Sequence, residues 1–278
     1  MRADLHLHSR FSDGSDSVEI LAQKIIEGGF SAVALTDHDT DLGNAPLAAL
    51  LPKDIRFIPG IEFTCTMPLG RCHILGYGFD GAHPAIREAI EEGKRRRRRK
   101  LDYRLALLEE NHGITLTEEE KAPLYETMTA AGKPHIAAIL VKRGLAGSIS
   151  EAIKRYMSHG KSRSEDRLPA DYAVKAILES GGIPVWAHPL GGEGEVHLEK
   201  DELCARLDYL MEAGIRGLEC HYSRYTSEET ALLLHLAEKH SLLVSGGSDY
   251  HGENKDIPLG RLSADGETVQ AQALSILA

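Results

Sequence analysis

The stretch "DLHLHS" spans residues 4–9 and places two histidines on alternate positions beside Asp4. In an extended strand, residues i and i+2 point to the same face, so His6 and His8 are expected to converge on one point. Two imidazoles directed at one point are typical of a metal site. The same pattern also fits the polar face of an edge strand, so the hexapeptide alone leaves both interpretations open.

The length, charge and cysteine content of the chain exclude several classes of protein. The chain has 278 residues, 42% of them hydrophobic, which is enough for one large α/β domain or a domain with an insertion. Its net charge of -10 argues against a general binder of nucleic acid or membrane surfaces. The four cysteines lack CxxC spacing, and no secretory apolar segment precedes Asp4, so we predict a cytoplasmic protein with buried thiols. No apolar run approaches the roughly 18 residues of a membrane-spanning helix, so no membrane partner is expected.

Short apolar segments alternate with amphipathic segments of helical length. Strands are predicted at 32–39, 56–62, 72–79, 183–189, 216–222 and 242–251, and helices between them at 17–28, 171–180, 200–213 and 227–240. Strand lengths and β-branched content suit a buried parallel sheet. The alternation predicts an α/β fold, either a (β/α) barrel or a doubly wound sheet.

Residues 84–165 interrupt this alternation. This region contains only helical patterns, at 85–111, 117–126, 134–143 and 150–158. We therefore predict an all-helical insertion that caps the active site, with residues 1–83 and 166–278 forming the α/β unit around it.

Most of the predicted strands are followed by side chains that can bind metal. Six histidines and three carboxylates lie at or just beyond strand ends: His6, His8, Asp13, His38, Glu62, His73, His188, Asp249 and His251. In parallel α/β barrels the C-terminal ends of the strands form one rim, where active sites are built. Any one of these histidines could be an ordinary core residue, but the whole set predicts a ring of ligands.

The ligand types indicate which metals fit. Imidazole mixed with carboxylate, without thiolate, favours Mn²⁺, Fe²⁺ or Zn²⁺, with Mn²⁺ preferred here. Nine ligands are too many for one ion, so two or three ions are expected, with one bridging carboxylate. Closely spaced divalent ions generate hydroxide near neutral pH and stabilise a phosphoryl group under attack. Phosphate-ester hydrolysis follows, although amide hydrolysis uses similar groups.

Taken together, the motifs resemble those of the PHP (polymerase and histidinol phosphatase) family, in particular its stand-alone phosphoesterase branch. The similar segments are "DLHLHSRFSDGS" (4–15), "ALTDHD" (34–39), "GIEF" (60–63), "HILGYGFD" (73–80), "AHP" (187–189), "GLECHYSRYT" (217–226) and "GSDYHG" (247–252). The resemblance implies a distorted (β/α)7 TIM-like barrel with a trinuclear metal centre.

The resemblance also implies how the ligands are shared among the ions. The implied sets are His6, His8, Glu62 and Asp249 for one ion, Glu62, His73 and His188 for a second, and Asp13, His38 and His251 for a third. Glu62 would then be the bridge. Asp4 and Asp37 each neighbour a ligand histidine and are candidates for orienting an imidazole.

Candidate substrate residues come from the insertion and from the segment after residue 216. The family commonly has an Arg-Pro-His motif where this chain has "GKPHIA" (132–137), so Lys133 keeps the charge of the arginine without its fork, and His135 is retained. After "YMSHGK" (156–161) the chain departs from the family pattern, and Lys161, Arg163 and Arg167 are ordinary loop cations or ligands of the leaving group. Tyr222 and Arg224 are candidate substrate contacts, and His221 and His135 candidate acid–base groups.

The run from Lys94 to Lys100 contains five consecutive arginines, Arg95 to Arg99. Such a run resembles an RNA-binding signal, but on a helix it covers every face, and the acidic residues before it offer partial charge compensation. A solvated helix and an electrostatic guide for a polyanion both remain open.

Three functions follow from these observations. The leading one is a metal-dependent phosphatase of small phosphorylated metabolites, most specifically one that removes the 3′-phosphate of nucleoside 3′,5′-bisphosphates. The second is a cyclic phosphodiesterase or a 5′-3′ exoribonuclease on short RNA with the same metals. The third, a non-catalytic metal-binding domain, is disfavoured because every expected ligand position is filled.

Overall fold

The computed structural model describes residues 2–125, 131–157, 164–192, 196–266 and 269–278. Within these residues an eight-stranded sheet forms the centre of the molecule. Its strands are β1 (Arg2–Leu7), β2 (Phe30–Leu35), β3 (Arg56–Met67), β4 (Gly70–Tyr77), β5 (Leu168–Pro169), β6 (Ile183–Trp186), β7 (Gly217–Tyr222) and β8 (Leu243–Gly247). Apart from β5, which pairs with β3, the neighbouring order is β1-β2-β3-β4-β6-β7-β8.

The segment after β8 returns to β1 and nearly closes the sheet into a barrel. The backbone N–H of Asp249 donates to the carbonyl of His6 at 3.0 Å, and that of His8 donates to the carbonyl of Tyr250 at 2.9 Å. The predicted distorted barrel is therefore confirmed, and its closure joins two segments that carry candidate ligands.

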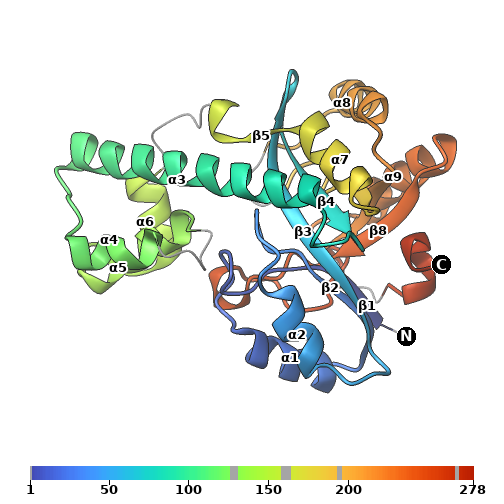
Figure 1. Cartoon of the computed structure of the whole chain (residues 1–278), viewed down its shortest axis with the longest axis horizontal. Coiled ribbons are helices and arrows are strands. Elements are labelled where there is room, and N and C mark those ends of the chain that lie inside the picture. Colours follow the sequence, from blue (N-terminus) through green and yellow to red (C-terminus); the bar gives the residue numbers. More distant parts are fainter. Residues whose placement is uncertain (1, 126–130, 158–163, 193–195, 267–268) are drawn as a thin grey trace.

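Helices α1 (Val18–Glu27), α2 (Asn44–Leu50), α7 (Ala170–Glu179), α8 (Lys200–Ala213) and α9 (Ser227–Lys239) lie around the sheet (Figure 1). The long helix α3 (Pro84–His112) runs past it, and α4 (Glu118–Tyr125), α5 (Lys133–Lys142) and α6 (Ile149–Tyr156) lie to one side, at the far end of α3. Ser17 and Thr226 cap the starts of α1 and α9, where their side chains accept hydrogen bonds from the backbone N–H groups of Ile20 and Glu229. Helices α3 to α6 fall within the predicted insertion and have a hydrophobic cluster of their own, including Leu101 and Leu140.

The prediction of an all-parallel sheet is wrong at one strand. Strand β4 runs antiparallel to both of its neighbours, β3 and β6. Only two residues separate the end of β3 from the start of β4, and a parallel connection needs a crossover of a dozen or more residues. The reversal puts the beginning of β4, where His73 lies, at the same rim as the ends of the parallel strands.

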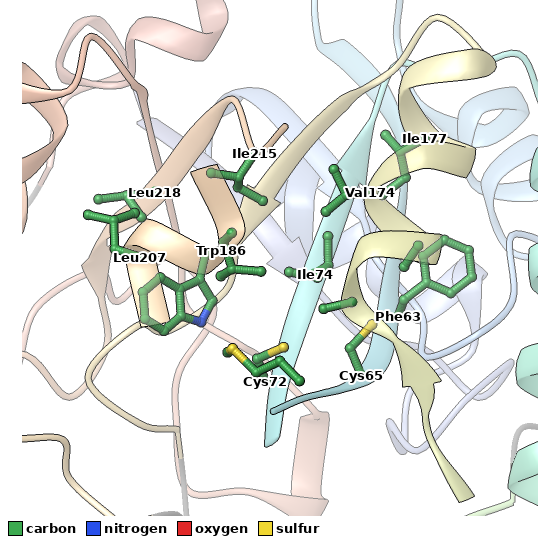
Figure 2. Close-up of a cluster of buried hydrophobic side chains, with 14 of the residues drawn as sticks. Phe63, Cys65, Cys72, Ile74, Val174, Ile177, Trp186, Leu207, Ile215 and Leu218 are labelled. Carbon is green, nitrogen blue, oxygen red and sulfur yellow. The ribbon is translucent and has the colours of Figure 1, made fainter. Parts of the chain in front are cut away.

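The largest core lies between the sheet and the helices α7 and α8 (Figure 2). Phe63 and Ile74, on β3 and β4, pack there with Ile177 of α7 and Trp186 of β6, each at most 2% exposed. The predicted free thiols are confirmed: Cys65, Cys72 and Cys220 are buried, and Cys204 is partly buried, all without disulfides among them. This packing fixes the strands whose opposite faces and ends carry the candidate ligands.

Gly247 allows β8 to pass close to His6 of β1. A Cβ atom at this position would lie 2.2 Å from the Cβ and 2.5 Å from the backbone nitrogen of His6. Both are fixed parts of a central strand, so the backbones must separate before a side chain fits. Only glycine is compatible with this approach.

We expect Gly247→Ala to lower the free energy of unfolding by about 1–3 kcal/mol, because it overpacks the closure of the barrel. Urea unfolding monitored by tryptophan fluorescence measures the loss. The matched control is Gly147→Ala, whose Cβ would meet only the end of the Glu151 side chain, at 3.2 Å. Equal stability of the two variants would contradict the packing argument.

Candidate metal centre

The Glu62 carboxylate is the centre of the site. Five histidine rings of the described chain lie around it. Its Oε2 atom is 3.3 Å from His6 Nε2, 3.2 Å from His8 Nε2 and 3.1 Å from His38 Nδ1. Its Oε1 atom is 2.9 Å from His73 Nδ1 and 3.2 Å from His188 Nε2. Glu62 is 1% exposed, so both oxygens are committed to this cluster.

Local backbone pairing brings His38 beside Glu62. The segment after β2 continues along β3, with the N–H of Glu62 donating to the carbonyl of Asp37 and the N–H of Asp39 donating to the carbonyl of Glu62. A one-residue bridge between His38 and Glu62 results. The imidazole therefore projects beside the carboxylate because the chain extends past the end of the strand.

Asp13 and Asp249 complete the set. Asp13 Oδ1 lies 3.1 Å from His251 Nε2, and its Oδ2 lies 3.8 Å from His38 Nε2. Asp249 Oδ1 lies 3.3 Å from His8 Nε2. The structure thus brings all nine predicted ligands together at one rim.

The donor atoms fit a bound metal. His6 Nε2, His8 Nε2 and His38 Nδ1 are buried and have no well-directed hydrogen bond within the described chain, although each lies close to a Glu62 oxygen. Three groups of ligand atoms lie within 4.8 Å of one another: His8, Asp13, His38 and His251; His6, His8 and Asp249; and His38, Glu62 and His73. Nitrogen and carboxylate oxygen atoms at this spacing suit divalent transition metals.

The backbone is strained at three positions of the site. Asp39, His188 and Asp249 have φ angles of 53°, 31° and 58°, in the left-handed region that non-glycine residues seldom adopt. Each lies within or next to the ligand set. Strain of this kind costs of order 1–3 kcal/mol per residue and persists where the surrounding structure holds it.

Glu219 holds two of the histidines, and sequence reasoning missed it. His6 Nδ1 donates to its Oε1 at 2.9 Å, and the backbone N–H of His188 donates to its Oε2 at 2.8 Å. The side chain is fully buried. Because Nδ1 of His6 carries the proton, Nε2 presents its lone pair to the centre. A carboxylate inside the apolar strand "GLEC" was the available signal.

Asp4 and Asp37 do not orient an imidazole, contrary to prediction. Asp4 accepts hydrogen bonds from the backbone N–H and hydroxyl of Ser248 and from the N–H of Gly260. Asp37 accepts from the N–H and hydroxyl of Ser9 and from the Ser12 hydroxyl. Both carboxylates hold loops that carry ligands, and burial raises the pKa of Asp4 to about 6 against the effect of these hydrogen bonds.

Two hydrogen bonds to one oxygen fix the Asp249 carboxylate. Its Oδ2 accepts hydrogen bonds from the Tyr222 hydroxyl at 2.9 Å and from Lys255 Nζ at 2.7 Å. Its Oδ1 is left to face His8. Tyr222 is 1% exposed, and its hydroxyl positions the candidate ligand Asp249. Its contact with substrate stays a prediction. Lys255, which the sequence did not single out, lines the central cavity of about 70 Å³ with Glu62.

Comparison with known proteins agrees with this geometry. The family model of the PHP domain matches residues 4–164, more than half of the chain. The chain belongs to the PHP-domain family. The nine candidate ligands are called the PHP centre below. The family match covers the first six of them, while His188, Asp249 and His251 come from the segment beyond it.

Three curated proteins are similar over nearly the whole chain. A phosphoribosyl 1,2-cyclic phosphate 1,2-diphosphodiesterase of Eggerthella lenta is 30% identical, with 93% of this chain and 97% of that protein covered. The 5′-3′ exoribonuclease Rnm of Escherichia coli is 29% identical, with 93% and 88% covered. A 3′,5′-nucleoside bisphosphate phosphatase of Chromobacterium violaceum is 27% identical, with 92% of each covered.

A solved structure has the same fold. An amidohydrolase from Chromobacterium violaceum, crystallised with bound sulfate and without metal, superimposes with a TM-score of 0.83 at 25% identity. The superposition covers 100% of this chain and 95% of the other. The predicted PHP fold and phosphoric ester hydrolase activity are confirmed, and the relatives' names fit both the predicted monoesterase and its diesterase alternatives. Among the described residues, every helix is too short or too polar to span a membrane.

The insertion reaches the PHP centre through the start of α5. The Cβ position of Gly132 lies 3.9 Å from Asp13 Oδ2, and the N–H of Gly132 donates to His135 Nδ1 at 3.1 Å. Lys133 follows on the first turn of α5 and is half-buried. The structure therefore places the predicted substrate residues Lys133 and His135 next to a candidate ligand.

The remaining predicted residues lie on β7, just beyond it, or outside the described part of the chain. His221 is half-buried, and burial lowers its pKa, but it forms no hydrogen bond or ion pair with a ligand of the PHP centre in the described ranges. Arg224 is exposed beyond β7. Their roles stay predictions. Lys161 and Arg163 lie outside the described residues.

The five arginines of α3 have partners within the protein. Arg96 donates to the carbonyls of Glu165 and Arg167, and Arg98 donates to the carbonyl of Tyr125. The others bond likewise: Arg95 to Glu92, Arg97 to Asp39 and Thr64, and Arg99 to the Glu165 carbonyl. Arg96 to Arg99 thus bond to parts of the protein outside α3, whereas Arg95 pairs with Glu92 of the same helix. Arg97 bonds Asp39, the residue after the ligand His38.

The charges within the PHP centre favour ionised carboxylates. Burial alone would raise the pKa of Glu62, but its interactions with the neighbouring imidazoles of His38, His6 and His73 hold it well below its usual range. A carboxylate that stays ionised in a buried position can serve as a metal bridge at neutral and acidic pH.

We expect Glu219→Gln to weaken manganese binding by about ten- to a hundredfold, because the amide has one acceptor oxygen for two donors, His6 Nδ1 and the His188 N–H, and one of the two histidines is no longer held. Competition with a fluorescent chelator measures the affinity. Glu228→Gln, an exposed position on α9, is the control. If both variants bind manganese as the unmodified protein does, Glu219 has no positioning role.

Proposed function

We propose that this protein is a manganese-dependent phosphatase that removes the 3′-phosphate of nucleoside 3′,5′-bisphosphates. The observation that carries the proposal is the sharing of both Glu62 oxygens among five imidazoles, which fits a carboxylate that bridges metal ions. Similarity to the nucleoside bisphosphate phosphatase of Chromobacterium violaceum supports the choice of substrate. The free thiols fit a reduced, cytoplasmic location.

The same residues would hold two or three ions. His6, His8, Glu62 and Asp249 would bind one, Glu62, His73 and His188 a second, and Asp13, His38 and His251 a third. When bound, such ions supply Lewis acidity toward water and toward the phosphoryl oxygens. His8 and His38 also lie between neighbouring groups, which keeps the three positions close together.

The chain's own residues supply orientation and charge. Lys255 and Tyr222 hold Asp249 so that one oxygen faces the cavity. Lys133 and His135, on the insertion, would bind the phosphoryl group from the side of Asp13. In this role helices α3 to α6 act as a cap that brings cations to a centre built by the barrel.

Diester hydrolysis is the second candidate. It is favoured by similarity to the diphosphodiesterase of Eggerthella lenta and to the exoribonuclease of Escherichia coli. Lys133 contributes charge without the bidentate fork of arginine, so it would bind a phosphate less directionally than the family's usual residue. A monoester and a diester therefore need to be compared directly.

The manganese-loaded protein is expected to release phosphate from adenosine 3′,5′-bisphosphate faster than from 2′,3′-cyclic AMP or a short 5′-phosphorylated RNA. Malachite-green detection and chromatography of the products measure the three rates. Removal of metal with a chelator should abolish activity, and manganese should restore it. Activity confined to the cyclic ester or to RNA would overturn the phosphatase proposal.

Glu62→Ala is expected to lower the metal content of the manganese-loaded protein by at least one ion per chain, because a bridge between ions is lost. Plasma emission spectrometry after gel filtration measures the ratio of metal to protein. Glu253→Ala, at an exposed site near the end of the same rim, is the control. An unchanged ratio would exclude a bridging role.

A further inference from the structure

Lys255 lines the central cavity of the PHP centre, which has a volume of about 70 Å³. Five candidate ligands, Glu62 among them, and Gly192 form the rest of the lining. One water needs about 10–15 Å³ of such space, so the cavity has room for several groups of that size, as a phosphoryl group requires. Among the described residues of this lining, only Lys255 carries an ammonium or guanidinium group. A lysine therefore borders the space that the ligands enclose.

Hydrogen bonds hold the segment that carries Lys255. The Asn254 side chain donates to the carbonyl of Asp13 at 2.9 Å, and the N–H of Glu253 donates to Ser15 Oγ at 2.7 Å. Both acceptors lie on the loop that carries the candidate ligand Asp13. The backbone of Lys255 is thus fixed relative to the PHP centre, and such preorganisation lowers the entropic cost of binding.

The Lys255 ammonium keeps N–H donors that the protein does not use. It donates to Asp249 Oδ2 at 2.7 Å, and Asp249 is its only hydrogen-bonding partner within the described residues. An ammonium carries three N–H donors, so two are left for water or a ligand. Tyr222 donates to the same Asp249 oxygen and does not line the cavity. A neutral donor thus already holds Asp249, and fixing this carboxylate does not by itself account for a charge at the cavity wall.

The charge of the site restricts what the ammonium can bind. Divalent ions at two or three positions would carry more positive charge than Asp13, Glu62 and Asp249 carry negative charge. An ammonium next to these ions is repelled by them unless an anion lies between. A phosphoryl group provides that anion and accepts charge-assisted hydrogen bonds, whereas a neutral amide does not balance the charge.

We propose that Lys255 is a phosphate-binding residue of the PHP centre and directs the site toward phosphate esters. One N–H of the ammonium holds Asp249, and the other two donate to phosphoryl oxygens of the bound ester. The same bonds would stabilise the negative charge on these oxygens in the transition state. The inference deepens the proposed function and rests on it, since it names a further residue that contacts the substrate.

Binding of inorganic phosphate to the manganese-loaded protein tests the contact directly. We expect Lys255→Met to raise the Kd of phosphate by about ten- to a hundredfold, because hydrogen bonds from a charged group to the anion are lost. Isothermal titration calorimetry at saturating manganese measures the Kd, and plasma emission spectrometry checks that the variant keeps its metal. Lys255→Arg, which keeps the charge and the donors, should recover most of the affinity.

Tyr222→Phe is the matched control, because it removes the other hydrogen bond to Asp249 Oδ2 and leaves the lining of the cavity intact. Its phosphate Kd should rise much less than that of Lys255→Met. An equal rise in both variants would show that Lys255 acts only through Asp249, and would overturn the proposal. An unchanged phosphate Kd in Lys255→Met would overturn it as well, and so would loss of manganese from that variant, which would limit the lysine to holding a ligand.

Phosphate binding also separates this inference from the proposed function. If the protein releases phosphate from no nucleotide, but phosphate binding still depends on Lys255, the proposed function fails and the lysine keeps its role. If the unmodified protein and Lys255→Met hydrolyse adenosine 3′,5′-bisphosphate with the same kcat/KM, the phosphatase stands and the inference fails.

Discussion

The structure depends on placing one carboxylate among five imidazoles in the interior. Glu62 is an anion at the rim of a barrel, and nearly every unusual feature of the fold serves the groups around it. The extension of the chain past β2 delivers His38, the closure of β8 on β1 aligns His6 with Asp249, and the reversal of β4 delivers His73. Burying three carboxylates among these imidazoles is costly unless a cation balances their negative charge, because each buried charge loses its hydration.

Around that centre, the protein uses carboxylates in two different ways. One set supplies candidate metal ligands: Glu62, Asp13 and Asp249. The other set accepts hydrogen bonds that hold the surrounding loops and the His6 ring in place: Asp4, Asp37 and Glu219. This second set explains how left-handed backbone at His188 and Asp249 is maintained.

Much of this arrangement could be predicted from the sequence. Apolar runs of strand length located most of the sheet, and ligand types at their ends located the metal centre, because parallel strands share a rim. The reversal of β4 was within reach, since the predicted strands at 56–62 and 72–79 leave only residues 63–71 between them, too few for a parallel crossover. Glu219 was within reach only as an unusual carboxylate inside an apolar strand, because its partner His6 lies 213 positions away and no spacing links them. The bond from Tyr222 to Asp249 was likewise out of reach, because a sequence gives the position of a side chain in a strand but not its partner or its burial.

The bond between Arg97 and Asp39 couples two parts of the chain that would otherwise be independent modules. Asp39 adopts a left-handed backbone directly after His38, and the guanidinium that holds it comes from a helix of the insertion. Exchange of the helical segment between relatives, whether by recombination or in a laboratory chimera, would therefore disturb the barrel unless this pair travelled together. The insertion is thus less interchangeable than its position between two barrel segments suggests, and its divergence is constrained by the arginines of α3 that bond to the barrel, Arg97 and Arg87 among them.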